Sequence, residues 1–332
     1  MNLVRNFNID KEKWHNLLEK SQYSSAFQTL EFYNLYNSTD NLCAEAFAIE
    51  EDGEYKSLIV VTIQKEKGLK GFFSKRGVVY GGPLLIGSEI EFLEFLLKNV
   101  RQYYKRKLIY LEVRNNFDFS SSLEVFEKFG WKYEPHLNVQ LNLENTNVED
   151  ILSAMKYNRR REVKLSYKEG VIVKLAKDEK EVSLLYDILK DMYLNRVKLP
   201  INDISFFLNL YKSKIGKVFV VIHNDKIIGG AFCLYYNNMA INTLYYTGLR
   251  NYHKKIFPTH IAIMGIIEFA IESNLKMVDF MGAGKPNINY GVRDYKLQFG
   301  GDLVEYGRFN IIFKPLLYKL GVLGLQILAK IK

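Results

Sequence analysis

The same succession of strand-like and helix-like segments runs through both halves of this 332-residue chain, and this repetition limits the possible folds more than any other feature. Strands are predicted in the first half at residues 43–50, 57–64, 107–114 and 136–143. Strands are predicted in the second half at residues 171–176, 217–236 (two strands around an Asn-Asp turn), 239–248, 277–284 and 302–309. Helical patterns separate them, as at residues 180–196 and 257–274. The sequence therefore predicts an α/β (α+β) fold of two domains, each a mixed, mostly antiparallel sheet flanked by helices.

We expect the domain boundary near residue 150. Residues 1–150 hold the first set of strands, residues 151–310 hold the second, and residues 311–332 form an apolar, basic tail. At roughly 100–200 residues per domain, the length fits two domains. A hydrophobic fraction of 48% and a charged fraction of 25% are ordinary values for a globular protein.

Composition excludes several protein classes. The two cysteines, Cys43 and Cys233, are too few for a disulfide scaffold, or for a four-ligand zinc site on their own. The five histidines are scattered without metal-ligand spacing, so no metal ion is expected. Because the sequence shows no signal-peptide core and no run of about 18 apolar residues, we expect a cytoplasmic protein.

Positive charge is concentrated in residues 156–169, at the expected domain junction. The chain has 46 Lys and Arg against 37 Asp and Glu, a net charge of +9 that favours anionic partners. On a helix, one face would carry the basic side chains Lys156, Arg160, Arg161, Lys164 and Lys168. We interpret this basic face as a site for a phosphorylated ligand or RNA, with a merely solvated helix face as the alternative.

A lysine between glycines distinguishes residues 277–301. A predicted strand ends at Met281, and Gly291 and Gly300 enclose a short segment that carries Lys296. Because glycines let the backbone turn closely, we interpret Lys296 as a cation directed into a cleft, where it would stabilise a phosphate or an oxyanion. The alternative is a surface lysine on a short helix.

Four motifs occur in an informative order. They are Ala26–Phe32, the glycine-rich Arg76–Pro83, the segment Arg160–Val171, and the ending Asp279–Gly282 followed by Gly291–Lys296 and Phe299–Gly301. Together they resemble the FemABX family of non-ribosomal peptidyltransferases, which consist of tandem GNAT-like acyltransferase lobes. The resemblance spans nearly the whole chain. Three residues depart from the usual pattern, because Phe32 replaces a Trp, Ser166 an Ala and Tyr295 a Phe.

The resemblance implies transfer of an aminoacyl group from charged tRNA to an amine of a peptidoglycan or cell-wall precursor, which is nucleotide- or lipid-linked. Aminoacyl-tRNA is then a substrate, and no cofactor is expected. Lys296 matches the family lysine near the reacting ester and Tyr295 precedes it, so both are assigned to the catalytic group. Arg196 is similar to a family arginine near the acceptor phosphates. The expected protein is a monomer.

Further assignments rest on residue type. Tyr246 and Tyr290 are candidate cleft hydroxyls that would bind substrate together with Lys156, Arg160 and Arg161 of the basic face, although packing against a sheet would explain each tyrosine equally. No general base can be assigned. Asp279 lies in a buried-strand pattern that favours structural hydrogen bonding, and His260 lies on an apolar helix typical of a core histidine.

Two departures bear on the acyl donor. The helical arm that larger family members use for tRNA has no counterpart here, and the glycine-rich CoA signature of GNAT enzymes is missing from the corresponding turn, residues 256–260. Three hypotheses therefore remain: a FemABX-like aminoacyltransferase, a GNAT-type N-acyltransferase that uses acyl-CoA to modify an amino sugar in surface-polysaccharide biosynthesis, and a catalytically silent binding module.

The C-terminal tail has its own pattern. Residues 311–332 include four lysines and no acidic residue, and leucines at helical spacing give a broad apolar face. Such a helix could lie peripherally on the anionic inner face of a membrane. The alternative is a tail that packs back onto the first domain and buries the same leucines.

Overall fold

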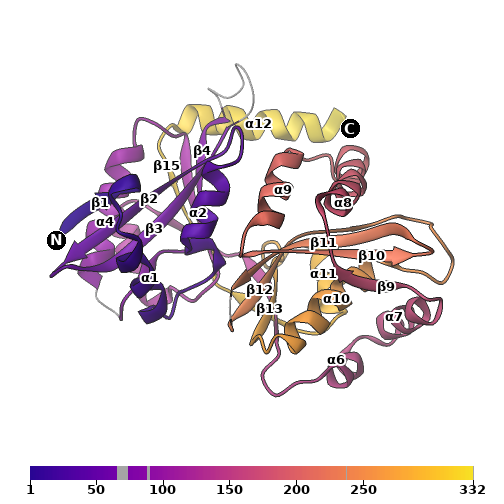
Figure 1. The fold of residues 1–332 in the computed structure, drawn as a ribbon. Coiled ribbons are helices and arrows are strands. Elements are labelled where there is room, and N and C mark those ends of the chain that lie inside the picture. The colour runs from indigo at the N-terminus through magenta and orange to yellow at the C-terminus, as the bar shows by residue number, and fades with distance from the viewer. Residues whose placement is uncertain (66–73, 88–89, 237, 332) are drawn as a thin grey trace. The chain divides into compact units, whose positions relative to one another are not determined.

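The computed structural model describes residues 1–65, 74–87, 90–236 and 238–331, and it divides the chain into two compact units (Figure 1). The first unit comprises Met1–His136 together with Glu305–Lys332, and the second comprises Leu137–Val304. Each unit has its own sheet and its own hydrophobic core. The fold class predicted from the sequence is confirmed.

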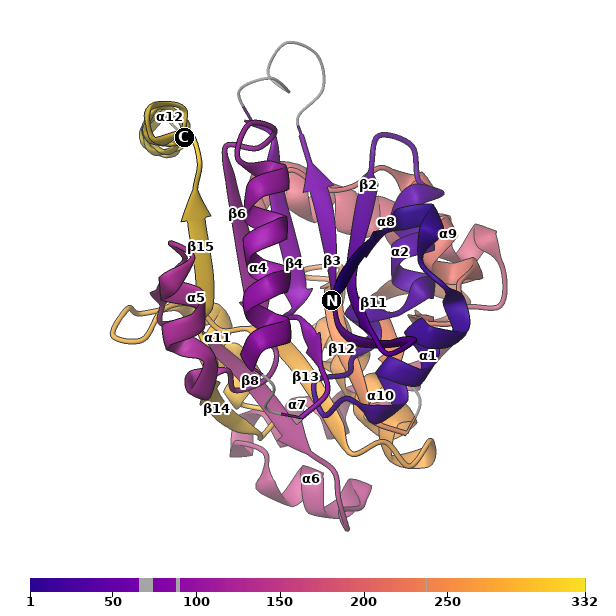
Figure 2. The same cartoon turned by 90° about the vertical axis from the view of Figure 1, so that its left-hand side faces the viewer.

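The first unit is built on a sheet in the order β1-β2-β3-β4-β6-β15-β7, with β5 added to β3. Its strands are β1 (Asn2–Arg5), β2 (Cys43–Glu51), β3 (Glu54–Gln64), β4 (Arg76–Gly81), β5 (Leu84–Leu85), β6 (Tyr110–Asn115), β7 (Lys132–Glu134) and β15 (Arg308–Ile312). Its helices are α1 (Lys11–Lys20), α2 (Leu30–Asn37), α4 (Ile90–Tyr104), α5 (Leu123–Lys128) and α12 (Pro315–Ile331). Helix α4 crosses one face of the sheet (Figure 2). It buries an apolar stripe that includes Leu93, Leu96 and Val100.

The second unit is built on a sheet in the order β14-β8-β13-β12-β11-β10-β9. Its strands are β8 (Leu137–Asn142), β9 (Ile172–Leu175), β10 (Gly216–His223), β11 (Lys226–Tyr236), β12 (Ala240–Gly248), β13 (Met277–Gly282) and β14 (Asp302–Glu305). Its helices are α6 (Val148–Ala154), α7 (Tyr157–Lys168), α8 (Glu179–Met192), α9 (Ile204–Lys212), α10 (Pro258–Glu272) and α11 (Gly291–Leu297). Helices α8 and α9 cover one face of this sheet, and α10 covers the other (Figure 1).

The unit boundaries differ from the boundary expected at residue 150. Strand β8, expected in the first domain, pairs with β13 in the second sheet, and β15, expected in the second domain, pairs with β6 in the first. The single strand predicted at 302–309 is in fact two strands, β14 and β15, which lie in different sheets. Gly307, with φ +65°, lies between them in the left-handed conformation that favours glycine. Alternation of apolar residues predicts a strand but not its partner, which explains the difference.

Helix α12 ends the chain and belongs to the first unit. Within the described part of the chain, no helix combines the length and the apolar character that a membrane span requires.

Candidate active site

The two parallel strands of the second unit separate along their length. β12 and β13 are paired over only three residues, ending at Asn242 and Asp279, although β12 continues to Gly248 and β13 to Gly282. In the first unit, the parallel strands β4 and β6 stay paired over five residues. Backbone groups beyond such a separation lose their ladder partners. The second unit therefore offers main-chain donors and acceptors to a ligand between two strands, and the first unit does not.

Two buried polar atoms lie where β12 and β13 separate. Oδ1 of Asn242 and Oγ1 of Thr243 have no hydrogen-bond partner among the described residues, and the two residues are only 2% and 3% exposed. Among the described residues, the Asn242 amide nitrogen reaches only the weakly accepting sulfur of Met281, at 3.6 Å. Because nearly all buried polar atoms in folded proteins are hydrogen-bonded, these two need a partner from outside the chain, a ligand or a water.

Lys296 reaches the end of β13 from α11. Its Nζ donates to the carbonyl oxygens of Gly282 at 2.8 Å and Met281 at 3.3 Å, and the residue is 5% exposed. Burial lowers the pKa of Lys296 to about 8, against the opposing effect of the Asp279 charge. An ammonium group has three N–H donors, so one remains without a partner among the described residues. The structure thus excludes a surface lysine, and the catalytic role of Lys296 stays a prediction.

Asp279 holds the backbone beside Lys296. Its Oδ1 accepts from the backbone nitrogen of Met281 at 2.6 Å, and its Oδ2 accepts from Nε2 of Gln140 at 3.2 Å. Met281 has a φ of +63°, a conformation that a long side chain rarely adopts, and the bond to Asp279 stabilises it. Burial raises the pKa of this fully buried carboxyl group. Asp279 therefore has the structural role expected from the sequence.

Tyr295 is tied to a buried polar network on α7 and α10. Its hydroxyl lies 3.0 Å from Nδ1 of His260, and Nε2 of His260 lies 3.2 Å from Oε2 of Glu162. That Glu162 oxygen also accepts from Nη1 of the buried Arg159 at 3.0 Å. Burial, assisted by the Arg159 charge, lowers the pKa of His260 to about 3, so the imidazole is neutral. The network assigns the ring proton to Nε2, which leaves Nδ1 to accept from the Tyr295 hydroxyl.

Three tyrosine hydroxyls gather in this part of the unit. The Tyr246 and Tyr295 rings stack with centroids 6.0 Å apart, and Tyr193 packs edge-on against Tyr245 at 5.8 Å. Burial raises the pKa of Tyr193 and of Tyr246, and the nearby Tyr290 hydroxyl raises both further. The structure thus brings the two predicted residues, Tyr246 and Tyr290, together with Tyr193, and their hydroxyl groups can donate to a substrate.

Arg196 lies on a π-helical turn, Tyr193–Val197, that continues α8. Such turns occur frequently at functional sites. Burial and the adjacent Arg250 charge lower the pKa of Arg196, and neither arginine has a carboxylate partner in the described ranges. Two neighbouring guanidinium groups without a counter-ion suit a phosphate or a carboxylate.

Helix α7 carries the basic face predicted from the sequence. A hollow of about 310 Å³ follows it, lined by Tyr157, Arg160, Arg161, Lys164, Leu165 and Lys168. Lys156 lies at the start of the helix outside this lining, and its backbone nitrogen donates to the carbonyl oxygen of Gln298 at 3.2 Å. The structure brings Arg160 and Arg161 together at the hollow. It shows no contact between either arginine and Lys296 in the described part of the chain.

The N-terminus of α10 is closed by the chain itself. Ser166 Oγ accepts from the backbone nitrogen of Phe257 at 2.9 Å, and Pro258 has no N–H. The nitrogens of His260 and Ile261 both donate to the carbonyl oxygen of Phe257. In this first turn, only the N–H of Thr259 has no hydrogen-bond acceptor within the described part of the chain. The Thr259 nitrogen lies 2.7 Å from the point where a Cβ on Gly248 would stand. This helix start lacks the row of free donors that holds a pyrophosphate.

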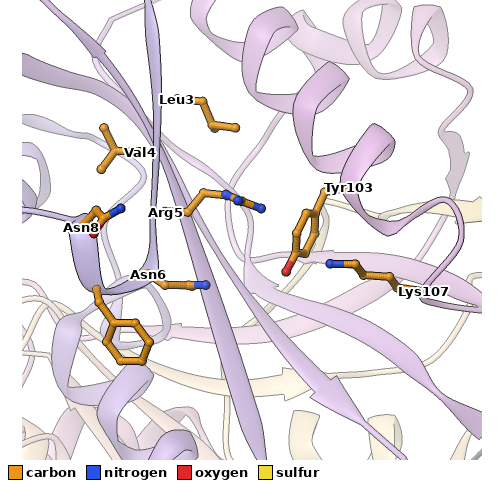
Figure 3. Close-up of a pocket in the computed structure, with 8 residues that line it drawn as sticks. Leu3, Val4, Arg5, Asn6, Asn8, Tyr103 and Lys107 are labelled. Atoms are coloured by element: carbon orange, nitrogen blue, oxygen red, sulfur yellow. The ribbon is translucent and has the colours of Figure 1, made fainter.

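A separate hollow of about 650 Å³ lies in the first unit (Figure 3). The Tyr103 ring there has Nζ of Lys107 3.3 Å and Cζ of Arg5 4.8 Å from its centroid, and its hydroxyl donates to Oε1 of Glu45 at 2.6 Å. The contact between Arg5 and Tyr103 fixes β1 to α4, and these cation–π contacts indicate a structural role for the hollow. Among residues 1–65, 74–87, 90–236 and 238–331, no three His, Cys, Asp or Glu side chains are arranged to hold a metal ion.

Sequence reasoning missed four residues of the candidate site: Tyr193, Asn242, Thr243 and Arg250. Asn242 and Thr243 stand between the apolar residues Ile241 and Leu244 of β12, and this polar interruption was the available signal. No sequence signal distinguishes Tyr193 or Arg250 from the many other tyrosines and basic residues of the chain.

Comparisons with known proteins agree with this geometry. A family model described as an acetyltransferase (GNAT) domain matches residues 153–297. The structure is similar to that of FemX, with a TM-score of 0.73 at 15% identity over 96% of this chain and 99% of the other. It also resembles a tandem GNAT protein from the clavulanic acid biosynthesis pathway, with a TM-score of 0.58 at 10% identity over 94% and 98% of the two chains.

L-PGS from Bacillus licheniformis has a TM-score of 0.56 at 15% identity over 92% of each chain. No curated protein matches the sequence. The matched residues 153–297 include the separated strands, the basic helix and Lys296, so the family match and the candidate site coincide. The chain therefore has the tandem GNAT fold of FemX, and its second unit carries an acyltransferase domain of the GNAT type.

Proposed function

We propose that this protein transfers an aminoacyl group from charged tRNA to an amine of a peptidoglycan or other cell-wall precursor. The observation that carries the proposal is the closed N-terminus of α10. In a GNAT domain that uses acyl-CoA, the turn before the corresponding helix supplies backbone N–H groups to the pyrophosphate. Here the Ser166 hydroxyl accepts the N–H of Phe257, and the Phe257 carbonyl oxygen accepts the next two backbone donors of the turn that are paired. Pro258 has no N–H to offer. A donor other than acyl-CoA, with its phosphates bound elsewhere, fits this site better.

Two basic surfaces of the second unit can receive such a donor and its acceptor. The hollow along α7, with Arg160, Arg161, Lys164 and Lys168, suits the phosphate backbone of RNA. The exposed pair Arg196 and Arg250 suits the phosphates of a nucleotide- or lipid-linked acceptor.

The separated strands supply the reaction site. The acceptor amine attacks the ester carbonyl carbon of the aminoacyl group, a C–N bond forms, and the C–O bond to the ribose breaks. The amine proton passes to the departing ribose oxygen. The remaining N–H of Lys296 and the hydroxyls of Tyr246 and Tyr290 are the donors for the oxyanion that forms in between. Asn242 and Thr243 hold the extended part of the substrate between β12 and β13.

The test is incubation of the purified protein with a nucleotide-linked cell-wall precursor and either charged tRNA or acetyl-CoA, with the product identified by mass spectrometry. We expect the precursor to gain the mass of an aminoacyl residue with charged tRNA and no mass with acetyl-CoA. Deacylated tRNA and the Lys296→Ala protein are the controls. An acetylated product, with no reaction from charged tRNA, would overturn the proposal in favour of a CoA-dependent N-acyltransferase.

A further inference from the structure

Helix α12 is attached to the first unit mainly at its start. The backbone nitrogens of Phe313 and Lys314 donate to the carbonyl oxygen of Ile109 at 2.8 and 3.1 Å. One turn later, the Tyr318 ring packs edge-on against Tyr110 of β6, with centroids 5.2 Å apart. Figure 2 shows α12 end-on, beyond the end of β15. The helix therefore projects from the sheet and does not lie on the core.

Three leucines of α12 are on the side away from this contact. Leu316, Leu320 and Leu323 are 79%, 63% and 52% exposed. At about 100° per residue they fall within roughly 60° of one another, and Tyr318 lies about 180° from their centre. The helix extends to Ile331. The structure thus argues against a packed tail for these three leucines, because packing would bury them and they are exposed.

Charge distinguishes this apolar stripe from an ordinary exposed patch. From Phe309 to Lys332 the chain has four lysines and no Asp or Glu. Lys319 is exposed and, by its position, stands about 40° from Leu323 at the edge of the stripe. Contiguous exposed apolar residues mark an interaction site more often than single exposed leucines do, so we expect this stripe to have a partner. A leucine stripe with Lys319 at its edge, in a segment free of carboxylates, complements a bilayer, which has an apolar interior and, with anionic lipids, a negatively charged surface.

We propose that α12 docks on an anionic lipid bilayer, with Leu316, Leu320 and Leu323 inserted into the interface and Lys319 beside the headgroups. A second copy of the chain is a poorer occupant, because two such faces would bring lysines together without any acid between them. A single helical stripe is also small beside the roughly 1,200–2,000 Å² that a stable protein interface buries. The inference is independent of the acyl donor, and docking would place the enzyme where lipid-linked acceptors lie.

The test is flotation of the full chain with vesicles of phosphatidylcholine alone or phosphatidylcholine with phosphatidylglycerol. We expect flotation with the anionic vesicles and weakening as salt rises. Leu320→Glu combined with Leu323→Glu should reduce bound protein at least tenfold, and Lys319→Glu should reduce it less. The matched controls are Leu184→Glu, an exposed leucine on α8, and Lys98→Glu, an exposed lysine on α4, and both should float like the parent protein.

Three results would overturn the proposal. They are absence of flotation by the parent protein, equal flotation of the stripe variants and the parent, and a dimer in light scattering that the stripe variants dissociate. Leu316→Gln with Leu320→Gln repeats the test without added negative charge. Circular dichroism of each variant verifies the fold, which exposed positions should preserve.

Discussion

Nδ1 of His260 lies 3.0 Å from the Tyr295 hydroxyl, one residue before Lys296 on the same short helix. This bond joins α11 to α10, and Glu162, bonded to the other nitrogen of the ring, joins both to α7. Helices α10 and α7 thus fix the position of α11, and with it the direction from which Lys296 reaches β13. The Tyr295 hydroxyl already has a partner in the fold, which favours positioning over direct catalysis for this residue.

Replacement of Tyr295 by Phe, the residue usual in the FemABX motif, tests that role. We expect a loss of unfolding free energy of about 1–3 kcal/mol, because Nδ1 of His260 loses its donor within a buried network. We expect kcat to change only a few-fold. Denaturant unfolding and steady-state kinetics measure the two effects. A hundredfold fall in kcat without loss of stability would instead assign Tyr295 to the catalytic group, as expected from the sequence.

Acid should destabilise the fold through His260. Its folded pKa of about 3 lies below the ordinary value of 6.5, so between these limits the unfolded chain binds a proton that the folded chain excludes. The free energy of unfolding therefore falls as pH decreases from 6.5 towards 3, by up to about 1.4 kcal/mol per pH unit. His136, whose pKa is lowered to about 4 mainly by burial, adds to the slope. His260→Gln should flatten the profile, and His15→Gln, at an exposed position, should not.

Loss of the Lys296 ammonium should slow the reaction. Lys296→Ala removes a donor aimed at the separated strands, and we expect kcat to fall about 10²–10³-fold in a folded protein. Because the pKa of Lys296 is lowered to about 8, a role as a cation also predicts that activity of the parent protein declines above pH 8, as the ammonium loses its proton. Activity that rises through this range would indicate that the neutral amine acts as a base.

The sequence predicts the parts of this site better than their arrangement. The periodicity of apolar residues predicts the strands and helices, and the flanking glycines distinguish Lys296 from other lysines. Both signals are local in the sequence. The assignment of β8 and β15 to their sheets depends on pairing between residues far apart in the sequence, for example Arg308 with Arg114. Ser166 is a second residue whose tertiary contact the sequence does not predict. The sequence marks it as a departure from alanine, and only the fold shows that its hydroxyl closes the start of α10.

Thr243→Val separates binding from stability. The Thr243 hydroxyl is buried without a partner among the described residues, so its replacement by an apolar group of the same shape should leave the free energy of unfolding unchanged or raise it by about 1 kcal/mol. If a substrate supplies the missing partner, KM should rise severalfold. Thr62→Val is the control, because that buried hydroxyl donates to the carbonyl oxygen of Val78 at 2.8 Å and its loss should cost stability. An unchanged KM together with lower stability would remove Thr243 from the site.

Charge reversal on α7 tests the proposed RNA surface. Lys156→Glu combined with Arg160→Glu replaces two cations of the basic face by anions, and we expect charged tRNA to bind at least tenfold more weakly at low salt. The difference should shrink as salt rises, because each phosphate contact contributes to the salt dependence of binding. Lys11→Glu combined with Lys98→Glu makes the same change of net charge in the first unit, at exposed positions, and should weaken binding much less.

Equal losses of affinity in the two double variants would mean that tRNA binding depends only on the net charge of the protein. No loss from either would leave α7 as a solvated helix face, and the anionic donor would then have to bind at Arg196 and Arg250.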